Sequence, residues 1–335
     1  MQRPNTNRFS APYLEKEKSV CFKIVECRII LLGTDVPINE LDLLLTYKCN
    51  LECDHCFVFG GPDAKGVMKL LDIEEILNQA EKVGSIEWIY IEGGEPVLYY
   101  PILLWGMREA KKRGFKTGFI TNAYWATSVE DAKEWLRPIA EIGIQNAIIS
   151  DDLFHYGKDE ENLARYAVQA SKELGIPVGN ISIEDPKQYT KEKEWKGKPV
   201  MEGAVLFKGR PAEKLAEGLP RKPWETFDKC LDEDFSNQKR VHIDPFGYVH
   251  LCQGITMGNL KRTPLQVLFK QFDPHKHPIC GPILKGGPAE LVRTYHVQHE
   301  EGYVDECHMC YSTRVKLRKM FPEVLAPDQM YGTHS

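Results

Sequence analysis

Between residues 41 and 207 the sequence alternates short apolar stretches with amphipathic ones, a pattern typical of parallel β/α folds. The apolar stretches predict six strands, at residues 41–47, 86–94, 116–123, 144–152, 176–184 and 200–207. Amphipathic stretches predict the helices that separate the first five strands, at 71–84, 102–114, 129–143 and 161–175. Because a closed barrel of this kind needs about eight such units, we expect an α/β fold that is an open, partial (β/α)6 barrel of the TIM type.

The alternation stops after residues 208–225, which are rich in turn formers and charged residues. The stretch "VHIDPFGYVHLC" (241–252) predicts a β-hairpin around Pro245 and Gly247. No regular pattern follows it, so we expect a small, irregular C-terminal domain. These features divide the chain into an N-terminal extension (1–40), a partial barrel (41–215) and a C-terminal domain with a tail (216–335).

Composition and charge argue against several classes of protein. The formal net charge is −5, whereas a nucleic-acid-binding domain more usually carries a basic stripe. No apolar stretch approaches the length that crosses a membrane. The N-terminus, "MQRPNTNRFSAPYLEKEK", is polar and lacks the apolar segment of a secretory signal. We therefore expect a cytoplasmic protein that binds neither nucleic acid nor a membrane.

The ten cysteines are distributed unevenly along the chain. In a reducing cytosol they are better explained as metal ligands, catalytic groups or buried thiols than as disulfides. Three lie close together after the first predicted strand, and five lie in the C-terminal domain: Cys49, Cys53 and Cys56, then Cys230, Cys252, Cys280, Cys307 and Cys310. Cys21 and Cys27 occupy an apolar stretch, where we expect them to pack. Two separated groups predict two metal sites.

The first group has the spacing C-x3-C-x2-C. Three thiolates from one loop suit an iron–sulfur cubane that leaves one of its four irons free for another ligand. A zinc site with His55 as the fourth ligand is an alternative, because structural zinc sites close their coordination shell. The same spacing is also one face of a buried helix. Polar neighbours such as Asn50, Glu52 and Asp54 argue against simple packing.

Polar or glycine-rich motifs follow three further predicted strands: "GGEP" (93–96), "TNA" (121–123) and "SDD" (150–152). Ligands of parallel β/α folds gather at the carboxyl ends of the strands, so we expect these motifs to share a site with the cysteine triplet. Paired glycines allow close backbone approach to a ligand, and Glu95 can accept a hydrogen bond from a cationic amine. Each motif also has a simpler explanation, as a turn or a helix cap.

Taken together, the triplet with His55 before its last cysteine and the strand-end "GGEP" resemble the radical S-adenosylmethionine (radical SAM) enzymes. The resemblance implies a [4Fe–4S] cluster on Cys49, Cys53 and Cys56, with S-adenosylmethionine chelating the open iron. It implies electron transfer from an external reductant of the flavodoxin or ferredoxin type, and a 5′-deoxyadenosyl radical that abstracts hydrogen from the substrate. The residues that the resemblance assigns to cofactor binding are His55, Gly93, Gly94, Glu95, Pro96, Asn122, Ser150, Asp152 and Ile181.

The second cysteine group contains enough thiols for a complete four-ligand site. "GYVHLC" (247–252), preceded by Cys230, resembles the start of the auxiliary-cluster domain called SPASM, or of its shorter form, twitch. The resemblance implies one auxiliary [4Fe–4S] cluster on Cys230, Cys252, Cys307 and Cys310. A zinc ribbon is the alternative. Cys280 is left over, as a substitute ligand, a hydrogen-atom donor or a buried thiol.

The sequence does not identify the substrate or a catalytic residue. Relatives with auxiliary clusters often modify peptides or protein side chains, so a peptide or protein is the first expectation and a small molecule the alternative. From other classes of protein, a non-catalytic zinc scaffold and a plain electron carrier would also use grouped cysteines. An electron carrier would leave the strand-end "GGEP" without a purpose.

Overall fold

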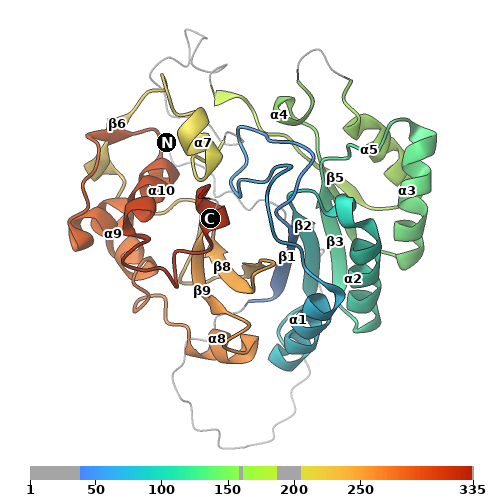
Figure 1. Ribbon diagram of the computed structural model, residues 1–335, viewed down its shortest axis with the longest axis horizontal. Helices are drawn as coiled ribbons and strands as arrows, with labels where there is room; N and C mark the ends of the chain where they lie inside the picture. Colours follow the sequence, from blue (N-terminus) through green and yellow to red (C-terminus); the bar gives the residue numbers. More distant parts are fainter. Residues whose placement is uncertain (1–37, 158–160, 187–204, 334–335) are drawn as a thin grey trace, which may run out of the picture.

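The computed structural model describes residues 38–157, 161–186 and 205–333. Its centre is an eight-stranded sheet in the order β5-β4-β3-β2-β1-β7-β8-β9 (Figure 1). The strands are β1 (Glu40–Thr46), β2 (Trp88–Gly93), β3 (Lys116–Thr121), β4 (Asn146–Ser150), β5 (Val178–Ile181), β7 (Arg240–Ile243), β8 (Tyr248–Cys252) and β9 (Ile255–Asn259). In this order, each pair of adjacent strands from β5 through β1 to β7 is parallel. The pairs β7–β8 and β8–β9 are antiparallel. The sheet is therefore mostly parallel.

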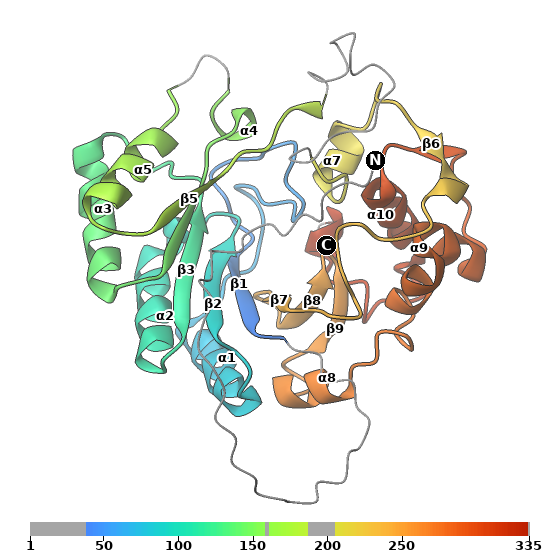
Figure 2. The ribbon, with the colours of Figure 1, turned by 180° about the vertical axis from the view of Figure 1, so that it is seen from behind.

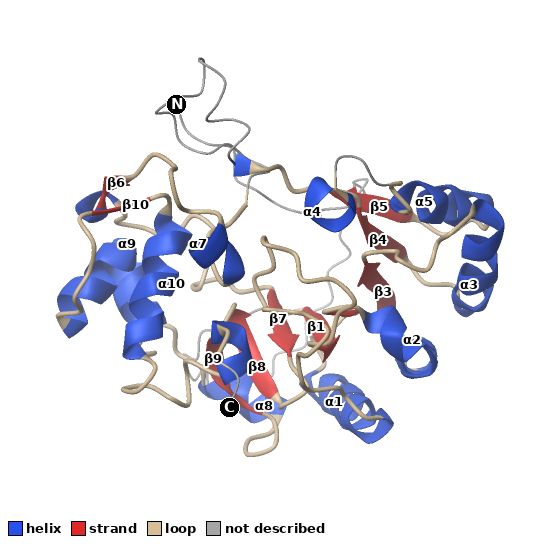
Figure 3. Ribbon diagram, turned by 45° about the horizontal axis from the view of Figure 1, so that its top comes forward, coloured by secondary structure: helices blue, strands red, loops and turns tan. Residues whose placement is uncertain are grey.

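Four helices lie along the outer side of the parallel strands (Figures 2 and 3). They are α1 (Leu70–Val83), α2 (Tyr100–Lys112), α3 (Val129–Ile142) and α5 (Ala164–Glu173); the short helices η1 (Pro96–Tyr99) and α4 (Leu153–Tyr156) follow β2 and β4. The apolar positions of α1, such as Ile73, Leu77 and Ala80, are buried against the sheet, as its periodicity predicts. These helices bury one face of the sheet and leave the other face for a site.

The C-terminal part is more regular than the sequence predicts. It contains α7 (Arg210–Lys214), α8 (Leu265–Gln271), α9 (Cys280–Tyr295) and α10 (Glu306–Leu317), the short helices η2 (Trp224–Thr226) and η3 (Asp328–Tyr331), and a two-stranded sheet of β6 (Lys222–Pro223) and β10 (Gly302–Tyr303). The prediction of an irregular domain is wrong for this reason. Gly286 and Gly287 have non-helical backbone angles inside α9 and Pro288 comes directly after them, so the helical periodicity is broken there in the sequence as well.

The first five predicted strands and the 241–252 hairpin are confirmed. The sixth predicted strand is not observed in residues 205–207, which have no regular structure, and residues 200–204 lie outside the described part of the chain. Instead, β7 extends the sheet by pairing in parallel with β1. The sheet thus continues past residue 215, and the predicted domain division stays a prediction. Of the helices that the structure describes, none is both long and apolar enough to cross a bilayer.

The two faces of the strands differ in character. In β1, Leu41, Leu43 and Leu45 are fully buried toward the helices, while Asp42 and Leu44 line a cavity on the opposite face. Strands of a parallel sheet that is buried on both faces are usually apolar throughout. The charged residues on this inner face therefore indicate that it borders a binding cavity rather than a core.

Candidate functional site

The cysteine triplet lies on the loop between β1 and α1, at the carboxyl edge of the parallel strands. Amide hydrogens point at two of the three sulfurs: Leu51 N lies 3.4 Å from Cys49 Sγ, and Gly60 N lies 3.2 Å from Cys56 Sγ. The Asn122 side chain, at the end of β3, adds a third donor 3.6 Å from Cys49 Sγ. Hydrogen-bond donors aimed at sulfur stabilise thiolates, so this loop suits a metal-bound cluster.

Burial of the thiols works against their charged form when no cation is bound. It raises the pKa of Cys49 to about 12, and it also raises the pKa of Cys53, with the neighbouring sulfurs contributing further. Thiols in such surroundings stay protonated at neutral pH unless a cation stabilises the thiolate. Binding of a metal ion or a metal cluster here would therefore be coupled to release of thiol protons.

Gly93 and Gly94 bring the end of β2 against the cysteine loop. A Cβ atom on Gly93 would lie 2.3 Å from the carbonyl oxygen of Thr46, and one on Gly94 would lie 2.3 Å from that of Lys48. Gly93 also has φ +151°, a conformation that side chains disfavour. The pair is thus required for close contact between two backbones, and both glycines also line the cavity.

Glu95 does not line the cavity; it lies behind Gly93 and Gly94, which do. Its side chain is fully buried and accepts hydrogen bonds from Val97 N (3.0 Å), Thr121 Oγ1 (2.9 Å) and Asn122 N (2.7 Å). The expectation that Glu95 accepts from a cationic amine does not match this arrangement, because its carboxylate joins the ends of β2 and β3. Pro96 begins η1 and is also buried away from the cavity.

Glu95 should make the stability of the protein depend on pH. Burial raises its pKa to about 7, against 4.5 for an exposed glutamate. The folded state then holds a proton that the unfolded state releases, so stability is present below pH 4.5 and is lost as pH rises toward 7. Between these pH values the free energy of unfolding of the wild type should fall by roughly 2–3 kcal/mol relative to Glu95→Gln. Urea titrations of both proteins would measure this, and parallel pH profiles would contradict it.

His55, Ser150 and Asp152 are brought together next to the triplet. Asp152 caps α4 by accepting from Phe154 N at 3.1 Å, and it also binds His155 Nδ1 at 2.8 Å and Ile183 N at 3.1 Å. The capping explanation for Asp152 is therefore confirmed. Burial lowers the pKa of His55 to about 4, which keeps its ring neutral. That ring stacks on Phe154, with 4.6 Å between ring centroids.

The structure also places His55 close to two other possible metal ligands. The ligand atoms of His55, Asp152 and His155 lie within 4.8 Å of one another. Ser150, at the end of β4, and Ile181, its register partner on β5, both line the cavity. Of the predicted cofactor residues, His55, Gly93, Gly94, Asn122, Ser150 and Ile181 thus face one space, whereas Glu95, Pro96 and Asp152 stand behind it.

The shared space is a cavity of about 550 Å³ on the inner face of the sheet. Its lining includes all three cysteines of the triplet and reaches Cys252 of the second group. Lys208 lies between the two cysteine groups. Its ammonium is 3.6 Å from Cys252 Sγ and 5.8 Å from the ring centroid of Phe57, the residue after Cys56. The two cysteine groups therefore border one continuous space, which the sequence did not predict.

The four cysteines proposed for the second site lie together in the structure. Cys230, Cys252, Cys307 and Cys310 line one small buried cavity between β8, α10 and the segment before β7. Glu233 N lies 3.4 Å from Cys230 Sγ. Burial raises the pKa of Cys252 to about 11. Four thiols around one buried space can hold a cluster or a metal ion.

Cys280 lies at the start of α9, is fully buried and does not line either cysteine cavity. Burial and then the nearby thiols of Cys252, Cys310 and Cys230 raise its pKa, so both a buried thiol and a substitute ligand of the second group fit its position. The eight cysteines in the described residues are all free thiols. Cys21 and Cys27, and the packing expected of them, lie outside the described residues.

Arg210 is a site residue whose role the sequence did not reveal. It is the second residue of "GRPAE" (209–213) and is buried. Its guanidinium donates to the carbonyl oxygens of Cys53 and Gly60, both at 2.8 Å. Its own backbone N donates to Cys56 O at 3.2 Å. Gly209 makes this approach feasible, because a Cβ atom there would lie 2.4 Å from Phe57 O. Arg210 thus stabilises the cysteine loop through hydrogen bonds, although it lies about 150 residues after that loop in the sequence.

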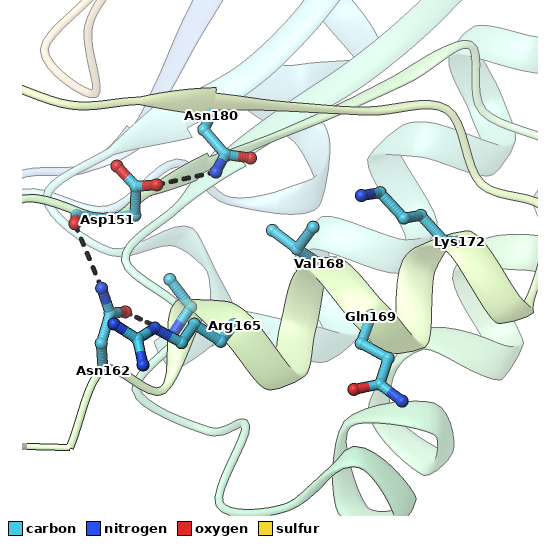
Figure 4. Close-up of a pocket in the computed structure, with 8 residues that line it drawn as sticks. Asp151, Asn162, Arg165, Val168, Gln169, Lys172 and Asn180 are labelled. Atoms are coloured by element: carbon cyan, nitrogen blue, oxygen red, sulfur yellow. Dashed lines mark hydrogen bonds between the residues drawn. The ribbon is translucent and has the colours of Figure 1, made fainter.

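A second depression, of about 540 Å³, lies at the outer edge between α5 and the ends of β4 and β5 (Figure 4). Asp151 there accepts from Asn180 Nδ2 at 2.7 Å and, through its carbonyl, from Asn162 Nδ2 at 3.2 Å. None of its eight lining residues in the described structure is a cysteine or a predicted cofactor residue. The candidate active site is therefore the cavity on the inner face.

Comparisons with known proteins agree with this site. Residues 43–182 match the sequence model of the Radical SAM superfamily. A tungsten-containing aldehyde ferredoxin oxidoreductase cofactor-modifying protein from Pyrococcus furiosus is 33% identical over 204 residues, which are 57% of this chain and 55% of that protein. The putative peptide biosynthesis protein YydG of Bacillus subtilis is 28% identical over 117 residues, which are 35% of this chain and 37% of that protein. The chain thus aligns with about half or less of these relatives.

Among solved structures, the crystal structure of BtrN in complex with AdoMet and 2-DOIA covers 70% of this chain and 83% of its own, at 14% identity and a TM-score of 0.47. The sequence match is the informative comparison. Residues 43–182 are therefore a radical SAM superfamily domain. A domain of this superfamily implies S-adenosylmethionine and a [4Fe–4S] cluster as cofactors.

Proposed function

We propose that the protein binds a [4Fe–4S] cluster through Cys49, Cys53 and Cys56 and cleaves S-adenosylmethionine reductively beside it. The observation that carries the proposal is three thiols on one strand-end loop, bordering a cavity that also contains Gly93 and Gly94. With three protein thiolates, one iron stays available to a small chelating ligand. When bound, the cluster and S-adenosylmethionine supply a 5′-deoxyadenosyl radical, using an electron from an external flavodoxin- or ferredoxin-type donor.

The residues of the chain would position these cofactors. The backbone around Gly93 and Gly94 would accept from the amino group of S-adenosylmethionine, because no side chain stands in the way there. Asn122 would orient Cys49 and Asn50 through its contacts of 3.6 and 3.0 Å. Ser150 and Ile181 would form the wall against the nucleoside. Glu95 and Asp152 would hold these groups in place from behind the cavity wall.

Three thiols on one strand-end loop suit a cubane with one open iron better than a structural zinc ion, which closes its coordination shell. Four cysteines around one small buried cavity suit one auxiliary [4Fe–4S] cluster on Cys230, Cys252, Cys307 and Cys310, in a SPASM- or twitch-like domain.

A peptide or a protein side chain is the proposed substrate. The name of one relative refers to peptide biosynthesis and that of another to modification of a cofactor. The cavity of about 550 Å³ is large enough for the methionine and nucleoside of the cofactor together with one substrate side chain. A small-molecule substrate is the alternative.

The proposed activity has a direct test. Protein that is reconstituted anaerobically with iron and sulfide and reduced with dithionite should convert S-adenosylmethionine into equal amounts of 5′-deoxyadenosine and methionine, measured by liquid chromatography. Iron and sulfide analysis should give a cluster content that matches two cubanes. Zinc without iron, or an iron-loaded protein that leaves S-adenosylmethionine intact, would refute the proposal.

A further inference from the structure

The inner face of the sheet carries a charged group of residues that the cofactors do not require. Asp42 on β1, Glu92 on β2, and Arg240 and His242 on β7 all line the active-site cavity. Asp42 and His242 are register partners across β1 and β7, and Glu92 pairs with Leu44 on the other side of β1. Asp42 lies four residues, or about 13 Å of strand, before the loop that holds the cysteines. We call Asp42, Glu92 and His242 the acidic cluster.

The members of the acidic cluster lie within reach of one another. His242 Nε2 is 3.3 Å from Asp42 Oδ2 and 3.3 Å from Glu92 Oε1. Arg240 Nε is 3.4 Å from Asp42 Oδ2. One oxygen of Asp42 is therefore paired with a guanidinium, while the rest of the cluster faces the cavity.

Two acceptor atoms of the cluster make no well-formed hydrogen bond. They are Asp42 Oδ1 and Glu92 Oε1, both buried; the Asp42 residue is only 3% exposed. Glu92 Oε1 lies 3.3 Å from His242 Nε2, and Asp42 also interacts with the carboxyl group of Glu40. A buried acceptor without a donor costs about 1–3 kcal/mol, and such atoms are few in folded proteins. Both atoms belong to residues of the cavity lining, so a ligand in the cavity can supply the missing donors.

Carboxylates outnumber cations around the cluster. Four carboxylates act on Arg240, those of Glu40, Asp42, Glu92 and Glu233. The other cation in the cavity lining, Lys208, is paired with Asp232. Burial keeps the pKa of His242 well below its ordinary value, so the imidazole adds no positive charge near pH 7. Burial also raises the pKa of Asp42 well above its ordinary value and that of Glu92 to about 7, so the charged forms are unfavourable without a further cation. A cationic ligand would remove this cost.

We propose that Asp42 and Glu92 bind a protonated amine or guanidinium group of the substrate, with His242 and Arg240 holding the two carboxylates in position. The inference rests on the proposed function, because it takes the cavity beside the cysteine loop as the place where the substrate lies. A lysine or arginine side chain of a peptide offers two or more N–H donors on one cation, which match Asp42 Oδ1 and Glu92 Oε1, the two acceptors without a formed hydrogen bond. The substrate is then a peptide that carries a basic side chain at or near the modified position, or a free amine.

A divalent metal ion is the competing occupant. The three ligand atoms lie within 4.8 Å of one another, as a metal site requires. However, the Asp42 oxygen near His242 is the one already paired with Arg240, and a guanidinium 3.4 Å from a ligand atom disfavours a doubly charged ion. The free oxygen of Asp42 is the other one, Oδ1, where a donor group can approach.

The test compares three probes that differ in charge: Nα-acetyl-lysine methylamide, Nα-acetyl-arginine methylamide and the neutral Nα-acetyl-norleucine methylamide. Binding to the full-length, cluster-loaded protein is measured by ligand-observed NMR without reductant, so no turnover occurs. We expect at least one cationic probe to bind about tenfold more tightly than norleucine. Asp42→Asn/Glu92→Gln should abolish this preference, and Glu92→Gln alone should reduce it if the double variant folds poorly.

The matched control removes two carboxylates from an exposed helix face. Glu130→Gln/Glu134→Gln on α3 changes the net charge by the same amount and should leave the preference for the cation intact. Equal binding of all three probes, or an unchanged preference in Asp42→Asn/Glu92→Gln, would overturn the inference. So would one equivalent of Zn²⁺ that binds the wild type and not this variant. Selective cation binding by a protein that fails to cleave S-adenosylmethionine would support the cation site and refute the proposed function.

Discussion

Replacing Cys49, Cys53 and Cys56 together by alanine should reduce cleavage of S-adenosylmethionine to the level of a reaction without enzyme. Each cysteine supplies one of the three thiolates, and a cubane that loses its protein ligands does not stay in place. The second cysteine group lies around a different cavity. We therefore expect the variant to keep about half of its iron after reconstitution, measured by iron analysis and visible absorption.

The reciprocal variant is the control for this experiment. Alanine at Cys230, Cys252, Cys307 and Cys310 should also remove about half of the iron but leave cleavage of S-adenosylmethionine measurable, because the triplet is intact. Circular dichroism shows whether each variant is folded. Full activity in the triplet variant, or loss of all activity only in the reciprocal variant, would place the reactive cluster at the second group and contradict the assignment.

The sequence allowed prediction of the strands and of the triplet because both depend on local patterns. Apolar alternation and helical periodicity recur within a dozen residues, and C-x3-C-x2-C fits in one loop. The glycine pair is visible in the sequence as a local motif, but its cause is not local: a Cβ atom on Gly93 or Gly94 would collide with the backbone of Thr46 or Lys48. The presence of such short motifs was thus predictable, whereas the contact that requires the glycines was not.

Residues that act across the sheet were not predictable in this way. Glu95 looked like a ligand-binding acid, yet its partners Thr121 and Asn122 come from the next strand and satisfy it completely. Asp42 and His242 are about 200 residues apart, and only the pairing of β1 with β7 makes them neighbours. In the structure β7, and not the predicted strand at 200–207, follows the parallel strands in the sheet. The periodicity of the sequence does not indicate that β7 pairs with β1. A single charged residue in an apolar strand, such as Asp42, was the available signal.

The C-terminal part was misjudged for a related reason. Gly286, Gly287 and Pro288 interrupt α9, and glycine and proline are ordinarily signs of turns. Tertiary packing outweighs this local signal: Ile283, Leu291 and Val292 of α9 are buried in hydrophobic cores. The segments of α9 before and after Gly286 and Gly287 therefore both stay helical, because each buries apolar side chains.

Replacing Arg210 by alanine should release the cysteine loop without touching a ligand. Two carbonyl oxygens, those of Cys53 and Gly60, would lose their 2.8 Å donors in a buried place. An unsatisfied buried group costs about 1–3 kcal/mol, so the loop should lose roughly 2–4 kcal/mol of local stability. Hydrogen exchange should be faster in residues 48–61 than in β2 or β3, and the iron of the first cluster should be lost faster to a chelator.

The conservative variant Arg210→Lys separates geometry from charge. A lysine keeps the positive charge but cannot donate to both carbonyl groups in the fixed geometry of a guanidinium, so it should restore only part of the stability of the loop. Arg137→Ala on α3 is the matched control, because that arginine is 55% exposed and pairs with the exposed Glu134; its effect should stay within about 0.5 kcal/mol. If Arg210→Ala exchanged and lost iron like the wild type, the loop would be held by its own turns and the glycine contacts alone. The link from α7 to the cysteines would then serve packing rather than cluster retention.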